Sequence, residues 1–217
     1  MDNASSGTQP HERRNPWSLS VTDITQAAVF AALIAALGLP GAINLPGGVP
    51  ITLQTMGVML AGAILGPKKG TLAVGIFMVL AIAGLPILAG GINGQASLAS
   101  ARGGYFLGFL PGVIVIGVLT AVMLSTPSGD GKPRYRVTWG ILINLLGGLV
   151  VIYACGVAWL VIRGYLTWWA AITTNGPYVA GDVIKAVITA LVAAQVHRGW
   201  PGLIEPIRLR KPSPPEP

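Results

Sequence analysis

Six long runs of apolar residues, nearly free of charge, make up most of this chain. A helix needs about 20 apolar residues to cross a bilayer, within a range of about 17–25. The pattern predicts an all-α integral membrane protein, a bundle of six transmembrane helices. The six runs are residues 22–39, 51–65, 70–85, 103–124, 137–162 and 177–196.

The second and third runs are at or below the short end of that range. They are either short spans or partly re-entrant segments, and the alternation of charge between the runs favours six crossings. Asp23 and Gln26 resemble a capping box at the start of the first run, and Pro40 ends it. The fourth run contains Pro111, where we expect a kink, and Pro177 suits the first turn of the last helix.

The composition supports the membrane assignment. Apolar residues make up 53% of the chain and charged residues only 10%, whereas a soluble domain carries about 25% charged residues. This excludes a soluble globular enzyme, a disordered chain and a disulfide-rich secreted module. The single cysteine, Cys155, lies inside an apolar run, so we expect a small buried side chain and no intramolecular disulfide.

The basic residues indicate how the helices are oriented. The net charge is +7, but the basic residues form short clusters between apolar runs, which suits topology signals better than a nucleic-acid surface. With six crossings, eleven of the fourteen lie on one side of the membrane. Positive charge favours the cytoplasm, so both termini are predicted to be cytoplasmic. The expected location of this multi-pass protein is the plasma membrane, a prokaryotic inner membrane. The eleven are Arg13, Arg14, Lys68, Lys69, Lys132, Arg134, Arg136, Arg198, Arg208, Arg210 and Lys211.

The two ends of the chain differ from its middle. Residues 1–20 are polar, and we expect a disordered cytoplasmic tail with no cleaved signal peptide. Residues 21–197 form the predicted membrane domain. Residues 198–217 are rich in proline and are predicted to be a second cytoplasmic tail.

Asp182 and Lys185 are the sharpest candidates for a binding site. They are an acid and a base set inside an apolar run, where ionisable groups are costly unless they face a partner or a polar cavity. At a spacing of three they share one helix face, which Tyr178 and Thr189 extend. The pair is either a structural ion pair or a polar ligand site near the outer end of the helix. A ligand with an amide- or urea-like ring and an acid group would suit both charges.

Two further segments carry polar groups at membrane boundaries. Residues 89–104 form a glycine-rich outer loop, in which backbone can approach a ligand closely. Thr52, Gln54 and Thr55 lie at the entry of the second run, where capping and helix–helix hydrogen bonds are the alternative to ligand contact. The polar residues of the outer loop are Asn93, Gln95, Ser97, Ser100 and Arg102.

Small residues recur at every fourth position in two of the runs, a spacing that lets helices approach closely. Those of the fourth run are expected to pack within the bundle. For the first run, internal packing and an external partner are weighed equally. The stripes are Gly104, Gly108 and Gly112, then Ala27, Ala31 and Ala35, and finally Ala28, Ala32 and Ala36.

Motifs of catalysis are missing. The segment Gly66-Pro67-Lys68-Lys69-Gly70-Thr71 does not have the lysine spacing of a phosphate loop, so ATP hydrolysis is not expected. The sequence has no HExxH and no cysteine pair, and neither histidine, His11 or His197, has a metal-ligand or triad partner nearby. We expect no enzyme, no cofactor and no metal site. An intramembrane enzyme using Asp182 is the remaining alternative of that class.

Several motifs together resemble the BioY family over residues 22–196. They are Val49-Pro50-Ile51-Thr52-Leu53-Gln54-Thr55, Leu60-Ala61-Gly62-Ala63-Ile64-Leu65-Gly66-Pro67-Lys68, Gly84-Leu85-Pro86 with Ala89-Gly90-Gly91, Gly103-Gly104-Tyr105-Phe106-Leu107-Gly108-Phe109, and Gly181-Asp182-Val183-Ile184-Lys185. Members of this family are the biotin-specific S components of energy-coupling factor (ECF) transporters. The resemblance implies a biotin pocket near the outer face, with biotin as the transported ligand. It also implies a partner module of one transmembrane coupling protein and two ATPases.

The resemblance also implies roles for individual residues. Asp182 and Lys185 carry over directly as binding residues. The helix face with Ala28, Ala32 and Ala36 resembles the family's docking surface for the coupling protein. This chain has Ala101-Arg102 where the family often has a Pro-Thr-type pair, so the group that meets the valerate of biotin stays open. The further binding residues that lie in matching stretches are Gln54, Asn93, Arg102 and Tyr105.

Two alternatives remain for transport. One is an S component for another vitamin, such as thiamine or riboflavin, which the motif set disfavours. The other is a stand-alone biotin permease, which the sequence does not separate from an S component.

Overall fold

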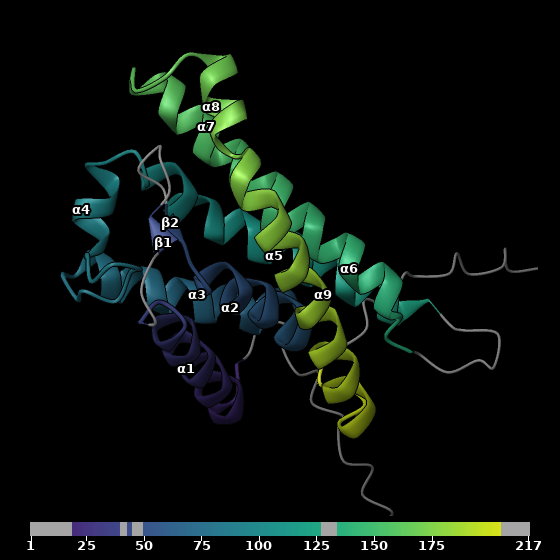
Figure 1. Ribbon diagram of the computed structural model, residues 1–217. Helices are drawn as coiled ribbons and strands as arrows, with labels where there is room; N and C mark the ends of the chain where they lie inside the picture. Colours follow the sequence, from purple (N-terminus) through teal and green to yellow (C-terminus); the bar gives the residue numbers. More distant parts are fainter. Residues whose placement is uncertain (1–18, 40–42, 45–49, 127–133, 205–217) are drawn as a thin grey trace, which may run out of the picture.

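The computed structural model describes residues 19–39, 43–44, 50–126 and 134–204, and these form an all-helical bundle (Figure 1). Both predicted tails lie largely outside the described residues. Strands are limited, in the described part, to a two-residue pair, β1 (Ile43–Asn44) and β2 (Pro50–Ile51). The helical elements are α1 (Val21–Ala36), α2 (Gln54–Leu60), the π-helical segment η1 (Ala61–Leu65), α3 (Gly66–Ile82), α4 (Gly94–Leu98), α5 (Gly103–Ser125), α6 (Val137–Leu145), the π-helical segment η2 (Leu146–Val151), α7 (Ile152–Ile162), α8 (Trp168–Thr174) and α9 (Gly176–Gly199).

Within the described residues, four continuous helical runs are long and apolar enough to cross a membrane. The predicted multi-pass, all-α membrane protein is thus confirmed. α1 is apolar but has only 16 residues, so it is not counted among the four. The four runs are Gln54–Ile82, Gly103–Ser125, Val137–Ile162 and Gly176–Gly199.

The first of these runs contains a sharp break where the sequence predicted a stop. Gly66 has φ 76° and ψ −170°, a backbone conformation that L side chains rarely adopt. Beyond it α3 packs against η1: a Cβ on Gly70 would lie 2.7 Å from the carbonyl oxygen of Ala61. The run is therefore two helical segments joined by the turn at Gly66-Pro67.

The glycine stripe of α5 packs inside the bundle, as expected. A Cβ on Gly104 would lie 2.2 Å from Cβ of Trp159, and one on Gly108 would lie 3.0 Å from Cα of Ile152. Gly112 lies equally close to η2. Through these glycines α5 packs directly against η2 and α7, and a larger residue at any of the three positions would not fit.

The two alanine stripes of α1 face opposite ways. Ala27 and Ala31 are buried against the bundle, whereas Ala28, Ala32 and Ala36 are exposed. The predicted cap needs a correction: Ser20 is the N-cap and Asp23 is its N3 partner, so the capping box begins three residues before Asp23. Asp23 is not the cap because its own backbone N–H is the group that Ser20 Oγ accepts.

Two segments expected to be loops contain short helices. α4 lies within the outer segment 89–104, and α8 lies between α7 and α9. Each begins at a side-chain cap: Asn93 Oδ1 accepts the N–H of Ala96, and Thr167 Oγ1 accepts the N–H of Ala170. Helices of five and seven residues are too short to produce an apolar period, which is why the hydrophobic pattern missed them.

Candidate functional site

A cavity that is partly open to solvent lies among α2, α5, α7 and α9, with about 700 Å³ of empty space including that opening. The turn that follows α3 and the end of α8 complete its walls. The residues that line it are Thr52, Gln54, Thr55, Leu88, Ala89, Ile92, Ser97, Arg102, Tyr105, Phe106, Phe109, Ile152, Tyr153, Asn175, Tyr178, Asp182 and Lys185.

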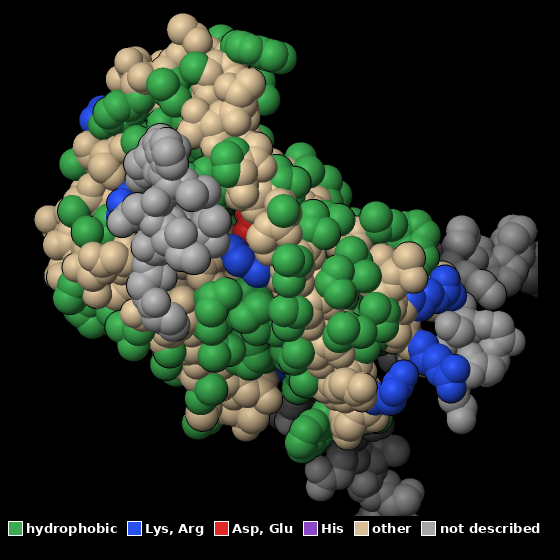
Figure 2. All heavy atoms as spheres, viewed as in Figure 1, with side chains coloured by type: hydrophobic (Ala, Val, Ile, Leu, Met, Phe, Trp, Pro, Cys, Tyr) green, Lys and Arg blue, Asp and Glu red, His purple; other side chains and the backbone are tan. Residues whose placement is uncertain are grey.

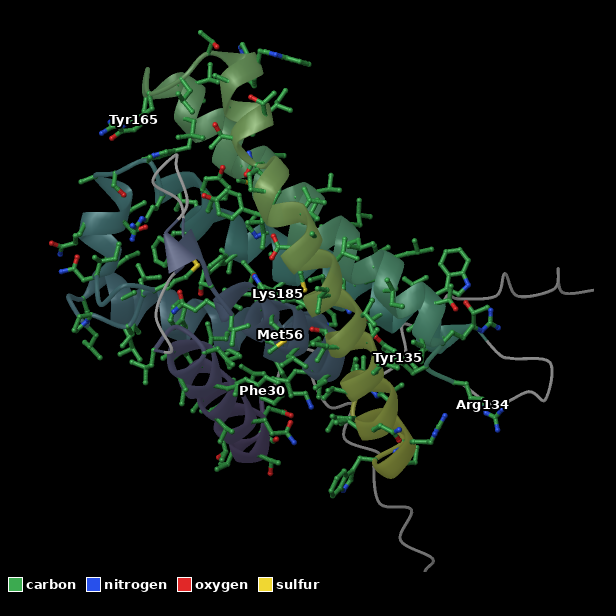
Figure 3. All side chains as sticks on the ribbon, in the orientation of Figure 1. Phe30, Met56, Arg134, Tyr135, Tyr165 and Lys185 are labelled. Carbon is green, nitrogen blue, oxygen red and sulfur yellow. The ribbon has the colours of Figure 1, made fainter. Side chains whose placement is uncertain are left out.

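Asp182 and Lys185 form a buried ion pair in the wall of this cavity. Lys185 Nζ lies 2.8 Å from Asp182 Oδ1, and the two side chains are 8% and 6% exposed. Both residues lie on the inner stripe of α9 together with Tyr178 and Thr189, which are also buried. Figure 2 shows an acidic side chain next to a basic one near the middle of this face, and Figure 3 shows Lys185 between α9 and α2.

The ammonium group of Lys185 is also bound to the start of α2. It donates to the carbonyl oxygen of Thr52 at 2.6 Å and to Thr55 Oγ1 at 3.3 Å. Since an ammonium carries three donors, these contacts and Asp182 satisfy it. The sequence placed Thr52 and Thr55 at a membrane entry, and the structure brings them to the charged pair.

Both oxygens of the Asp182 carboxylate have donors. Besides Lys185, Thr55 Oγ1 donates to Oδ1 at 3.4 Å, and the hydroxyl of Tyr153 on α7 donates to Oδ2. A carboxylate offers about four acceptor sites, so Oδ2 keeps capacity for a further donor from a ligand. Tyr153 was missed in the sequence because it lies in an apolar run with no polar neighbour at helical spacing.

A second polar pair closes the other side of the cavity. Tyr105 OH donates to Asn175 Oδ1 at 2.8 Å, and Asn175 Nδ2 donates to the carbonyl oxygen of Ala171 at 2.8 Å. Tyr105 was predicted as a binding residue and lines the cavity. Asn175 was not predicted. Its position directly before Gly176-Pro177, at a helix start, was the signal available.

Gln54 and Arg102 also line the cavity, and both contact the turn after α3. Gln54 Oε1 accepts the N–H of Ala89 at 3.1 Å, and Gln54 Nε2 donates to the carbonyl oxygen of Ile87 at 2.7 Å. Arg102 Nη1 donates to the carbonyl oxygen of Ala89 at 3.5 Å. The structure thus gathers Gln54, Arg102, Tyr105, Asp182 and Lys185 around one cavity.

Asn93 and the alanine stripe lie elsewhere. Asn93 is not among the lining residues, and its side chain caps α4. Of the other polar residues in the outer segment, Ser97 lines the cavity, whereas Gln95 Nε2 donates to the carbonyl oxygen of Ile82. Ala28, Ala32 and Ala36 are on the outer surface of α1 and do not line the cavity.

The cavity is charged at the Asp182–Lys185 pair and at Arg102, and it is apolar over most of its wall. Phe106, Phe109 and Ile152 are buried apolar residues within it. Such a site suits a small ligand with one polar ring, an apolar body and an acid group. Among the described residues, no group of three His, Cys, Asp or Glu side chains comes together as a metal site would require.

Comparison with known proteins agrees with this geometry. The model of the BioY family matches residues 9–202. The biotin transporter BioY of Rhodobacter capsulatus is 38% identical over 191 residues, which cover 84% of this chain and 96% of that protein. The biotin transporter BioY of Rhizobium etli is 39% identical over 186 residues, with 84% and 97% covered.

A solved structure shares the fold. The S-component for biotin from an ECF-type ABC transporter superposes with a TM-score of 0.75 at 32% identity, covering 83% of this chain and 95% of that one. The family model, the two relatives and this structure all extend over most of the described bundle. The chain belongs to the BioY family.

Proposed function

We propose that the cavity among α2, α5, α7 and α9 binds biotin, and that this is how the chain serves as the substrate-binding S component of an ECF transporter. The relatives are named biotin transporters and the solved neighbour is an S-component for biotin. The chain is a biotin transport protein rather than an enzyme, and biotin is its transported ligand, not a cofactor. The alternative of another vitamin is not favoured.

The main observation in support of this biotin site is the buried Asp182–Lys185 pair in the cavity wall. Biotin has a ureido ring with two N–H donors, an apolar sulfur ring and a valerate tail that ends in a carboxylate. Asp182 Oδ2 is the acceptor for a ureido N–H. The aromatic and aliphatic wall covers the sulfur ring. Arg102 is the cationic side chain proposed to meet the valerate, because the donors of Lys185 already have partners next to Asp182.

The proposed membrane arrangement is six crossing helices with both termini in the cytoplasm. The six are α1, α2 with η1, α3, α5, α6 through α7, and α9. In support, the exposed basic residues Arg134, Arg136 and Arg198 lie where α6 begins and α9 ends, and Figure 2 shows basic side chains clustered at one end of the molecule. Positive charge at one end is typical of the cytoplasmic side.

Exposed aromatic residues support the same placement. Trp139 and Trp200 lie near that basic end, while Trp168 and Trp169 are on α8 at the opposite end. Tryptophan is enriched at both membrane–water interfaces. The charged pair is in the half of α9 next to α8, so the cavity faces outward in this arrangement, as uptake across a plasma membrane requires.

The proposed partners are one transmembrane coupling protein and two ATPase subunits. The support from this chain is the exposed face of α1, where Ala28, Ala32 and Ala36 would allow another helix to approach closely. A stand-alone biotin permease would need no such surface. Genes for a coupling protein and ATPases beside this one would favour the ECF assembly.

Direct binding of biotin to the purified protein tests the proposal. Isothermal titration with biotin, and competition with thiamine and riboflavin, should show tight binding of biotin alone. Asp182→Asn in the same assay should weaken it. Equal binding of another vitamin would contradict the substrate, and unchanged affinity in Asp182→Asn would contradict the site.

A further inference from the structure

The turn after α3 is a wall of the cavity that is shaped largely by its own backbone. Leu88 N–H donates to the carbonyl oxygen of Ile92 at 3.1 Å, and Gly91 N–H donates to the carbonyl oxygen of Leu88 at 2.9 Å. Gly90 and Gly91 have φ of 86° and 71°, so the turn depends on glycine. Leu88, Ala89 and Ile92 line the cavity.

Gln54 fixes this turn to α2. Its amide binds on both sides of Leu88, accepting from the N–H of Ala89 and donating to the carbonyl oxygen of Ile87. The residue is only 2% exposed. An amide that is buried and bonded at both its oxygen and its nitrogen is suited to hold backbone in place more than to receive a ligand.

The end of α1 holds Gln54 in turn. A Cβ on Gly38, just past α1, would lie 2.4 Å from Gln54 Nε2 and 2.7 Å from its Cδ. Real Cβ atoms essentially never approach other atoms within 3.0 Å, so any side chain at this position must displace the glutamine. Gly38 is therefore packed directly on the atoms that bind the turn.

We propose that Gln54 is a positioning residue of the biotin site, and that Gly38 at the end of α1 sets its position. This rests on the proposed function, because it takes the cavity as the site. In this arrangement the end of α1 packs on the Gln54 side chain, and Gln54 binds the turn that forms the cavity wall. α1 itself contributes no lining residue. A shift of the end of α1 would reach Ala89 through the Gln54 amide.

If Gln54 has this role, the effect of a substitution at Gly38 on biotin affinity should depend on whether Gln54 is present. Gly38→Ala should raise the Kd for biotin about tenfold or more, because it displaces the two hydrogen bonds that hold the turn. Gln54→Ala should do the same. In the double variant, Gly38→Ala should add nothing, because no glutamine is left to displace. Gly75→Ala is the matched control, since a Cβ there meets nothing within 4 Å.

Hydrogen–deuterium exchange of residues 86–92 without biotin separates positioning from general damage. Gly38→Ala, Gln54→Ala and Gln54→Met, which keeps the side-chain length, should all exchange faster there, while α5 stays protected. Equal losses of affinity from Gly38→Ala with and without Gln54 would overturn the proposal, as would unchanged exchange. Faster exchange with unchanged affinity would also overturn the positioning role, whereas the proposed site itself is tested separately by Asp182→Asn.

Discussion

Tyr153 on α7 donates its hydroxyl to Asp182 Oδ2 on α9, while Lys185 holds the other oxygen of the same carboxylate. The ring of Tyr153 also packs edge-on against Tyr105, with centroids 6.2 Å apart. Tyr153 thus joins the charged side of the cavity to the Tyr105–Asn175 side. The carboxylate is neutralised at one oxygen and oriented at the other, which leaves its acceptor direction defined before a ligand arrives.

Tyr153→Phe should raise the Kd for biotin about tenfold, because a hydrogen bond to a charged group contributes about 1.5–3 kcal/mol. Phenylalanine keeps the ring contact with Tyr105, so the loss reports the hydroxyl. Titration calorimetry measures it. Tyr165→Phe is the control: the hydroxyl of Tyr165 donates to Ala99 O outside the cavity, so its affinity should equal that of the wild type. Equal affinities for both variants would contradict the orienting role.

Asp182→Asn should weaken biotin binding about ten- to a hundredfold, since one charged hydrogen bond is worth about 1.5–3 kcal/mol. The asparagine keeps the size but presents donors toward the donors of the ureido ring. Lys185→Met should also weaken binding, because it removes the cation that neutralises and holds Asp182 Oδ1. Affinity and melting temperature are both measured, for the two single variants and the double.

A purely structural ion pair predicts a different pattern. Each single change would then leave an unpaired buried charge and lower the melting temperature, and the double change would restore much of it. Affinity would stay unchanged throughout. That combination of results would show that the pair supports the bundle and that biotin binds elsewhere.

Gly104→Ala should destabilise the bundle by about 1–3 kcal/mol, the usual cost of overpacking. Its Cβ would lie 2.2 Å from Cβ of Trp159 and 2.5 Å from the carbonyl oxygen of Cys155, so α5 and α7 must separate. Thermal unfolding in detergent measures the change. Gly75→Ala should not lower the melting temperature, and an equal loss in both variants would mean that the α5–α7 contact is not the cause.

Replacing Ala28, Ala32 or Ala36 by tryptophan should leave biotin binding intact and prevent co-purification with the coupling protein. The three side chains are exposed, so a large residue can be accommodated in the isolated protein but blocks close approach of another helix. Ile188→Trp, on the exposed side of α9, is the control for a bulky surface residue. Normal co-purification of all three α1 variants would show that this face contacts lipid.

Cysteine labelling tests the orientation. In a Cys155→Ala background, a membrane-impermeant maleimide on intact cells should label Gln95→Cys, whose position is exposed in α4 on the proposed outer side. Ser213→Cys in the C-terminal segment should be labelled only after permeabilisation. Labelling of Ser213→Cys in intact cells would rule out the proposed topology of six crossings with both termini inside.

The sequence by itself determined the class of protein and most of the helices. Apolar runs with so little charge have few stable folds outside a bilayer, and the runs at 103–124, 137–162 and 177–196 lie within helices of nearly the same extent. The spacing of Asp182 and Lys185 placed them on one face because helical periodicity is local. Ionisable side chains within the membrane carry a high free-energy cost, so the sequence alone indicated that this pair faces a partner or a polar cavity.

Only the tertiary structure decided which residues of different helices meet. Tyr153 and Asn175 reach the cavity because of the rotation and height of α7, α8 and α9 relative to one another, and no spacing along the chain encodes these. The rotation of α1 against the bundle likewise turned Ala27 inward and Ala28 outward, although the two alanine stripes are equivalent in sequence. Gln54 looked like a ligand residue, but its buried amide is bonded to a turn more than thirty residues away, since a buried polar group takes whichever partner packing brings to it.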